Sequence, residues 1–281
     1  MQQKTYSTRW GTICYWVEPC PDSAWMLVFL PGLTADHTLF DRQIAYFSGR
    51  YSILVWDAPG HGASRPFPLD FSLDCQAQWL HDILSREGVQ SFCLIGQSMG
   101  GYVAQCFLQR YPNEAGGFVA IDSAPLKRRY VTGAELWALR HCEPIYRLYP
   151  WKALQRAAVR GCACTRQGQE VMGQMMSAYT REEYCALAGH GYRMLAQAMA
   201  ADLPYEISCP ALLLCGEHDR AASTRRYNKA WAKGEGLTLV WVPGAGHNSN
   251  TDNAPAVNRQ IEVFMQRLVE QHGPVSSPEQ A

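Results

Sequence analysis

The fold is decided by one stretch of the chain, Phe92-Cys93-Leu94-Ile95-Gly96-Gln97-Ser98-Met99-Gly100-Gly101. Its first four residues are apolar and predict a buried strand, which runs directly into a Gly-x-Ser-x-Gly pattern followed by a helix. On so sharp a turn the serine hydroxyl stands out above the sheet, and the glycines remove Cβ atoms that would collide. A glycine-rich, anion-binding turn has the same pattern, so the rest of the sequence has to decide between the two.

Outward from this stretch, the chain alternates short apolar runs with loops and segments of helical character. Runs that are apolar on both faces are typical of parallel strands covered by helices. Thr5–Trp10 and Thr12–Glu18 predict an antiparallel hairpin that leads into the sheet, and Ser72–Arg86 and Gly100–Arg110 predict crossover helices. We therefore expect an α/β fold with a mostly parallel, eight-stranded sheet flanked by helices. The further apolar runs are Trp25–Leu30, Ile53–Trp56, Phe118–Ile121, Ala211–Cys215 and Leu237–Val242.

One long segment, residues 126–205, interrupts this alternation. It contains no convincing strand, and Ala, Leu, Met, Gln and Arg, which favour helices, are prominent in it. A structureless loop of about eighty residues does not fit a compact domain, so we expect an inserted helical cap. The expected organisation is a core of residues 1–125 and 206–272, a cap of residues 126–205 and a disordered tail of residues 273–281.

The composition excludes several classes of protein. With 47% hydrophobic and 18% charged residues, the chain can bury a large core, which excludes intrinsic disorder. Its 25 basic residues balance 25 acidic ones, and this zero net charge argues against a nucleic-acid partner. The longest apolar runs are far shorter than the roughly 20 residues that cross a bilayer, so no membrane span is expected.

Eleven cysteines are scattered along the chain, and their odd number leaves at least one thiol unpaired. Together with an amino terminus that lacks an apolar signal segment, this pattern predicts a reduced, cytoplasmic protein. Cys162 and Cys164 form the one close pair, and without a second pair they do not make a structural zinc site. We expect no metal and no cofactor.

Two later loops supply groups that can activate Ser98. Asp219 follows the strand Ala211–Cys215 and His247 follows the strand Leu237–Val242, so both lie at the sheet edge where Ser98 lies. A neutral imidazole at His247 can accept the serine proton, and the Asp219 carboxylate can orient that imidazole and stabilise its cation. Only His272, beside the tail, also follows Asp219 among the histidines.

Two other carboxylates compete with Asp219 for this position. Glu217 lies two residues earlier and would point differently, whereas Asp122 ends the strand Phe118–Ile121 and could also reach a histidine. We favour Asp219 as the partner of His247 and expect Asp122 to anchor its own loop.

Attack by Ser98 on a carbonyl carbon would create an oxyanion that needs N–H donors close by. The backbone N–H of Met99, at the start of a helix, is one candidate. The second is the backbone N–H of Leu33, because Gly32 lets the chain turn inward after the strand that ends at Leu30. An ordinary Pro-Gly turn at Pro31 is the alternative.

These motifs together resemble the α/β-hydrolase superfamily, in its capped branch of small esterases, over nearly the whole chain outside the cap and tail. Asp57-Ala58-Pro59-Gly60-His61-Gly62-Ala63-Ser64 is similar to the family's Asp-x-x-Gly-x-Gly-x-Ser loop, which is structural. Pro31 departs from the His that is common before the glycine of the oxyanion loop. The family's haloalkane dehalogenases and epoxide hydrolases use Asp as the nucleophile, so Ser98 disfavours both chemistries.

The resemblance places residues 126–205 as a lid over Ser98. Trp137, Trp151, Met175 and Tyr184 in the lid are then candidates for substrate contacts, although many aromatic and Met side chains of a lid form its own core. Gln97, next to Ser98, and His37, close to the oxyanion loop, are further candidates. A lid of this composition favours a small to medium, mostly apolar carboxylic ester as the substrate.

The expected function is ester hydrolysis through an acyl-enzyme, by a monomer or homodimer acting on a small molecule. Carbon–carbon bond hydrolases, thioesterases and lactonases use the same three residues, so these activities stay open. A ligand-binding, receptor-like protein with slow turnover is a further alternative. A dinucleotide-binding oxidoreductase is disfavoured, because residues 96–101 do not fit Gly-x-Gly-x-x-Gly.

Overall fold

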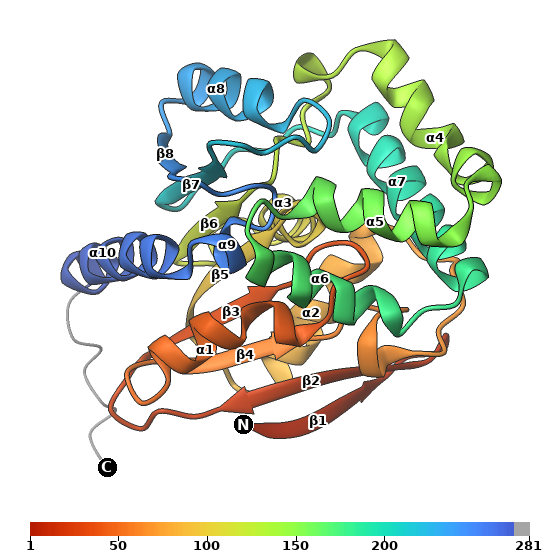
Figure 1. Cartoon of the computed structure of the whole chain (residues 1–281). Helices are drawn as coiled ribbons and strands as arrows, with labels where there is room; N and C mark the ends of the chain where they lie inside the picture. The colour runs from red at the N-terminus through yellow and green to blue at the C-terminus, as the bar shows by residue number, and fades with distance from the viewer. Residues whose placement is uncertain (273–281) are drawn as a thin grey trace, which may run out of the picture.

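The computed structural model describes residues 1–272 and has one eight-stranded sheet, so the predicted tail of residues 273–281 lies outside the described residues. The strand order is β1-β2-β4-β3-β5-β6-β7-β8. Pairs β1/β2 and β2/β4 are antiparallel and all others are parallel, which confirms the mostly parallel sheet (Figure 1). The strands are β1 (Gln2–Ser7), β2 (Thr12–Glu18), β3 (Trp25–Leu30), β4 (Ser52–Trp56), β5 (Ser91–Gln97), β6 (Gly117–Ile121), β7 (Ala211–Gly216) and β8 (Thr238–Val242).

The sheet is buried on both faces because its central strands are apolar throughout. All six residues of β3 are buried, and alternate ones enter different cores. Val28 and Leu30 pack with the helices α2 (Leu73–Arg86) and α3 (Met99–Arg110), whereas Leu27 and Phe29 pack with α1 (Asp41–Phe47) and α10 (Ala254–His272). The continuous apolar runs in the sequence are the signature of this two-sided burial.

Helices cover the two faces of the sheet, and the predicted crossover helices are present. Ser72 caps α2 by accepting a hydrogen bond from the Cys75 N–H (3.1 Å). Within residues 1–272, no helix is both long and apolar enough to cross a bilayer. The core contains η1 (His37–Phe40), α1 (Asp41–Phe47), η2 (Gly62–Ser64), α2 (Leu73–Arg86), α3 (Met99–Arg110), α8 (Thr224–Glu235), α9 (Ser249–Asp252) and α10 (Ala254–His272).

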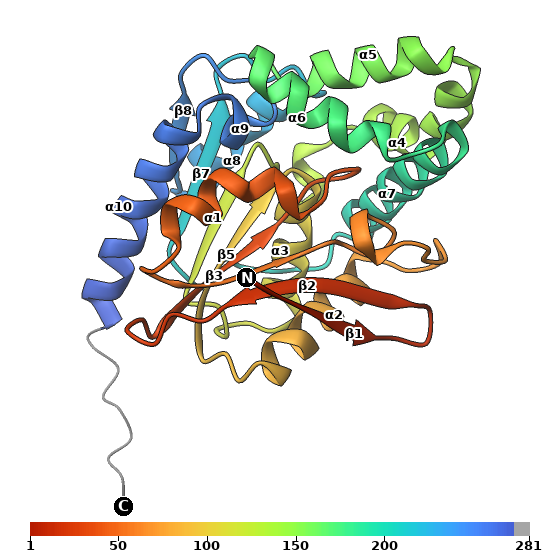
Figure 2. The ribbon, with the colours of Figure 1, turned by 60° about the horizontal axis from the view of Figure 1, so that its bottom comes forward.

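The expected helical insertion lies between β6 and β7 and is gathered on one side of the core (Figure 2). It consists of η3 (Arg128–Tyr130), α4 (Gly133–Leu148), α5 (Trp151–Cys162), α6 (Arg166–Ser177) and α7 (Arg181–Ala201). Met172, Met176, Tyr184 and Leu187 form an apolar cluster within it. The division into domains at residues 126 and 205 stays a prediction.

Asp252, the last residue of α9, ties this insertion to the core. Its carboxylate accepts hydrogen bonds from the N–H groups of Gly246 and Cys164 (both 2.8 Å) and from the N–H and hydroxyl of Thr165 (3.0 and 2.6 Å). The N–H of Asn248 also donates to the Cys162 carbonyl (2.7 Å). The turn between α5 and α6 is therefore held against the loop that follows β8.

Replacing Asp252 by Ala should loosen this turn. Four hydrogen bonds to a charged acceptor disappear, so we expect the free energy of unfolding to fall by about 2 kcal/mol. Trypsin should also cut several-fold faster after Arg166, whose side chain is 93% exposed. Asp70→Ala, at an exposed carboxylate, is the control. Equal cleavage rates in the two variants would show that Asp252 does not hold the turn.

Candidate active site

Ser98 occupies a strained backbone conformation between β5 and α3. Its φ is 48° and its ψ is −114°, outside the regions that residues other than glycine usually adopt. Two glycines permit this turn: a Cβ at Gly100 would overlap the backbone of Leu30, and a Cβ at Gly96 would overlap the backbone of Gly101. The hydrogen bond from the Ser98 N–H to the Ile121 carbonyl (2.8 Å) fixes the turn to the neighbouring strand.

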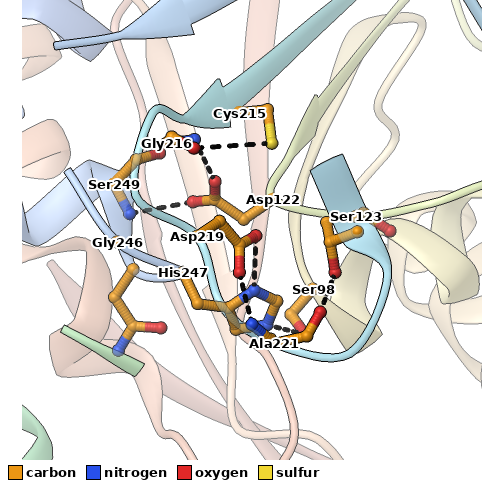
Figure 3. Close-up of polar contacts among 12 residues, drawn as sticks. Ser98, Asp122, Ser123, Cys215, Gly216, Asp219, Ala221, Gly246, His247 and Ser249 are labelled. Carbon is orange, nitrogen blue, oxygen red and sulfur yellow. Dashed lines mark hydrogen bonds and ion pairs between the residues drawn. The ribbon is translucent and has the colours of Figure 1, made fainter. Parts of the chain in front are cut away.

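Ser98, His247 and Asp219 form one hydrogen-bonded series, although they come from three separate loops (Figure 3). The Ser98 Oγ lies 2.8 Å from His247 Nε2, and His247 Nδ1 lies 2.9 Å from Asp219 Oδ2. When the imidazole is neutral, the Asp219 carboxylate favours the tautomer with the proton on Nδ1. Nε2 is then free to accept a hydrogen bond from the serine hydroxyl.

The surroundings of His247 favour its protonated form. Burial opposes the imidazolium, but the charge of Asp219, its hydrogen bond and the charge of Asp122 outweigh burial and raise the pKa of His247 above 6.5. The Asp219 side chain is fully buried, and its second oxygen accepts a hydrogen bond from the Ala221 N–H (2.7 Å). This bond fixes the carboxylate plane that faces the imidazole.

Asp122 joins the two loops that carry Asp219 and His247. Its carboxylate accepts from the N–H of Gly216 (2.7 Å), at the end of β7, and from the N–H of Ser249 (2.8 Å), at the start of α9. Burial, followed by the nearby charge of Asp219, raises the pKa of this carboxyl group. The Asp122 carboxylate therefore anchors the loops that follow β7 and β8, whereas the sequence predicted that it anchors its own loop.

Glu217, the other carboxylate considered as a partner of His247, does not contact the imidazole. It is exposed, and it accepts a hydrogen bond from the Gly244 N–H (3.1 Å). Of the three carboxylates considered, Asp219 is the one that contacts the imidazole of His247.

The two predicted oxyanion donors lie beside the Ser98 turn. A Cβ at Gly32 would come within 3.1 Å of the Ser98 Cβ, so the loop that carries Leu33 is packed against this turn. Neither the Leu33 N–H nor the Met99 N–H donates to another of residues 1–272. Both residues line a cavity together with Ser98.

Two cavities between the core and the helical insertion share Ser98. The large lobe has a volume of about 380 Å³ and the small lobe about 300 Å³. Both are lined by Leu33, Ser98, Tyr146, Tyr192, Ala221 and His247. The large lobe adds Tyr102, Glu135, Leu139, Leu195, Met199 and Tyr227, among others, and the small lobe adds Gln97, Leu154, Ala157, Met172, Tyr184 and Arg220, among others.

Comparison with known proteins identifies the family of this chain. Residues 27–260 match the sequence profile of the Alpha/beta hydrolase family. The chain belongs to this family. The match covers most of the sequence and includes the Ser98, Asp219 and His247 loops, and it confirms the resemblance drawn from the motifs.

Relatives of this alpha/beta hydrolase have diverse names. A magnesium-chelatase 30 kDa subunit of Rhodobacter capsulatus is 31% identical over 237 residues, which cover 76% of this chain and 78% of the relative. A 3-oxoadipate enol-lactonase of Acinetobacter baylyi is 23% identical over 254 residues, which cover 86% of this chain and 89% of the relative.

Solved structures share the fold. A thermophilic esterase from Thermogutta terrifontis has a TM-score of 0.78 at 22% identity and covers 95% of this chain and 99% of its own. An enol-lactonase from Burkholderia xenovorans has a TM-score of 0.72 at 22% identity, and the match covers 94% of this chain and 100% of the enol-lactonase. At these identities the likeness shows the fold alone.

Of the six predicted substrate contacts in this alpha/beta hydrolase, two line the small lobe. Tyr184 is one, and Gln97 is the other. The Gln97 amide also donates to the carbonyl of His247 (2.9 Å) and to the side chain of Asn248 (3.2 Å), so it holds the histidine loop in place.

The other four lie away from both lobes. His37 Nδ1 lies within hydrogen-bond distance of Asp57 Oδ1 (2.9 Å), and its ring stacks on Trp16. His37 therefore holds the loop that begins at Asp57. Trp137 is 63% exposed, because it lies on the outer face of α4. Trp151 packs against Tyr184, and Met175 is buried in the core cluster between α6 and the sheet. For Trp137, Trp151 and Met175, periodicity alone does not reveal which face of a helix in the insertion is turned inward. None of the four residues lines either lobe, and their contact with substrate stays a prediction.

Tyr102, Tyr227 and Glu135 line the large lobe and were not among the candidates from the sequence. For Tyr102 a signal existed, because it lies four residues after Ser98 on α3 and so one helical turn away. Tyr227 and Glu135 come from α8 and α4, which only the tertiary structure brings together.

The described residues contain one group of side chains spaced to hold a metal ion, Asp122, Cys215 and Asp219. Its carboxylates already accept hydrogen bonds from Gly216, Ser249, Ala221 and His247, and burial raises the pKa of the Cys215 thiol. All eleven cysteines are free thiols. We assign no metal or cofactor to these residues.

Asp122→Ala should destabilise the fold, because it leaves the buried N–H groups of Gly216 and Ser249 without acceptors. We expect the free energy of unfolding to fall by about 3 kcal/mol in urea titrations. Glu217→Ala, which removes an exposed hydrogen bond, should change it by less than about 0.5 kcal/mol. Similar values for the two variants would refute the anchoring role of Asp122.

Proposed function

We propose that this alpha/beta hydrolase is a serine esterase that cleaves a small to medium, mostly apolar carboxylic ester through an acyl-enzyme. The observation that carries the proposal is the hydrogen-bonded series from Asp219 through His247 to Ser98, whose hydroxyl lies at the junction of two largely apolar lobes. A nucleophile, a base and a group that orients the base are the parts that acyl transfer requires.

In the acylation step, Ser98 Oγ attacks the ester carbonyl while His247 Nε2 accepts its proton. Asp219 stabilises the resulting imidazolium, which then donates the proton to the departing alcohol oxygen. The N–H groups of Leu33 and Met99 hold the carbonyl oxygen as it becomes negative. Deacylation repeats these steps with water as the nucleophile, activated by His247, and releases the acid.

The two lobes suit the two sides of an ester. The side chains that line both are mostly apolar or aromatic, which supports an apolar substrate. The large lobe also contains Glu135, whose pKa falls to about 2: burial opposes this shift, but hydrogen bonds from Tyr227 and Thr132 outweigh it. The Glu135 carboxylate is also ion-paired with Arg226 (2.8 Å), so its charge is compensated.

Chemical labelling and a substrate panel test this proposal. We expect a fluorophosphonate probe to add one covalent group to Ser98, detected by intact mass, because His247 activates the hydroxyl. On acyl esters of graded chain length, Ser98→Ala should lower kcat/KM by about 10⁴-fold or more.

Thioesters, lactones and carbon–carbon substrates complete the panel, with Ser98→Ala as the blank. If kcat/KM is higher for one of these substrate classes than for every ester tested, that activity would become the assigned function in place of ester hydrolysis. An unlabelled protein, with Ser98→Ala as active as the wild type, would reject the nucleophile itself.

The pH dependence tests the pair of His247 and Asp219. The base works only when neutral, and its pKa is raised, so kcat/KM should fall in acid with an inflection above pH 6.5. Asp219→Asn removes the charge that favours the imidazolium, so the inflection should move to lower pH while kcat/KM falls by about 10³-fold to 10⁴-fold. Asp70→Asn should change neither quantity. An inflection that stays in place in Asp219→Asn would mean that another group titrates.

A further inference from the structure

An apolar surface lies on the outside of the helical insertion, and the side chains that form it line neither lobe. Nine large apolar side chains are exposed among residues 1–272, and four of them lie on α4 and the turn after it: Trp137 (63% exposed), Ile145 (50%), Leu148 (82%) and Tyr149 (51%). The first three are spaced by eight and three residues, so they share one face of the helix. We call these four residues the α4 stripe.

A row of cations continues from the stripe along α5. Lys152, Arg156 and Arg160 follow one another at intervals of four residues, are exposed and form no ion pair with any residue in the described range. Helix α5 contains no acidic residue. Figures 1 and 2 show it on the outside of the insertion. We call these three residues the α5 row.

The row belongs to a wider asymmetry of charge. Residues 126–205 contain eleven Lys and Arg but six Asp and Glu, which gives the insertion a net charge of +5 and leaves −5 on the rest of the chain. The zero net charge of the whole sequence therefore conceals a cationic insertion on an anionic core.

We propose that the α4 stripe and the α5 row form a docking surface for an anionic lipid bilayer. Trp and Tyr prefer the boundary between headgroups and acyl chains, Leu and Ile insert into the acyl region, and Lys and Arg attract anionic headgroups. Lys152 follows Tyr149 by three residues and Leu148 by four, so the apolar and cationic parts are continuous along the chain.

A second copy of this chain fits the surface less well. In a two-fold symmetric dimer built on it, each α5 row would face a surface of the same positive charge. Like charges without acidic partners repel, whereas anionic headgroups neutralise the row.

The surface also borders the cavities. Ala138 on α4 lines the large lobe, Ala157 on α5 lines the small lobe, and both are exposed to solvent. Docking would bring the side of the protein next to both lobes toward the bilayer, where apolar molecules dissolve. The docking itself does not depend on the chemistry of Ser98.

Vesicle sedimentation of the full chain tests the proposal. We expect the wild type to bind vesicles of phosphatidylcholine with about one third phosphatidylserine, and to bind pure phosphatidylcholine at least about tenfold more weakly. The variant K152Q/R156Q/R160Q should bind the mixed vesicles about 100-fold more weakly, and L148S/Y149S at least about tenfold more weakly. The wild type should lose binding as salt rises, because salt screens the row.

The variant R225Q/K229Q/K233Q on α8 is the matched control, because it removes the same charge from a cationic surface without the stripe. It should bind within about twofold of the wild type. All variants should nearly keep the melting temperature, because the changed side chains are exposed. They should also keep the hydrolysis of a water-soluble ester, since none of the changed residues lines a lobe. Equal losses from α5 and α8 would reduce the binding to unspecific charge attraction and overturn the proposal. Absence of vesicle binding, or a dimer in sedimentation equilibrium that L148S/Y149S abolishes, would also overturn it, the latter in favour of a second copy.

Discussion

The backbone strain at Ser98 is the constraint on which the site depends. A positive φ at a residue with a Cβ is unfavourable, and it persists here because β5 and α3 are both locked into the buried core on either side of it. Gly100 lies against the backbone of Leu30, so the helix starts as close to the sheet as a backbone permits. This contact holds the hydroxyl at a fixed height above the strand ends, where the loops of β7 and β8 can reach it.

Those loops are held by a network of polar contacts. Asp122 joins the end of β7 to the start of α9, and Gln97 holds the carbonyl of His247. Asp252 extends the same network to the insertion. A single buried carboxylate can accept hydrogen bonds from several backbone N–H groups and so fix the geometry of several loops at once. This suits a site assembled from segments far apart in the sequence.

Much of this arrangement could be predicted from the sequence, and the rest could not, for physical reasons. Apolar runs such as Trp25–Leu30 reveal a buried parallel strand, and Ser98, Asp219 and His247 are each placed by a strand directly before them. The lid helices gave weaker signals. Trp137 and Met175 both occur in helices with an apolar side, yet one faces solvent and the other faces the core. The choice depends on how α4 to α7 pack, and periodicity is the same for either face.

The sequence by itself determined the fold class, the helical insertion, and Ser98 and His247 as two members of the hydrogen-bonded series, because strand burial and turn geometry leave local signatures in residue type and spacing. The tertiary structure alone decided which carboxylate contacts His247, which side chains line the two lobes, and how the charges of the chain are distributed over its surface. These properties depend on distances between segments that are remote in the sequence, and no local pattern encodes such distances.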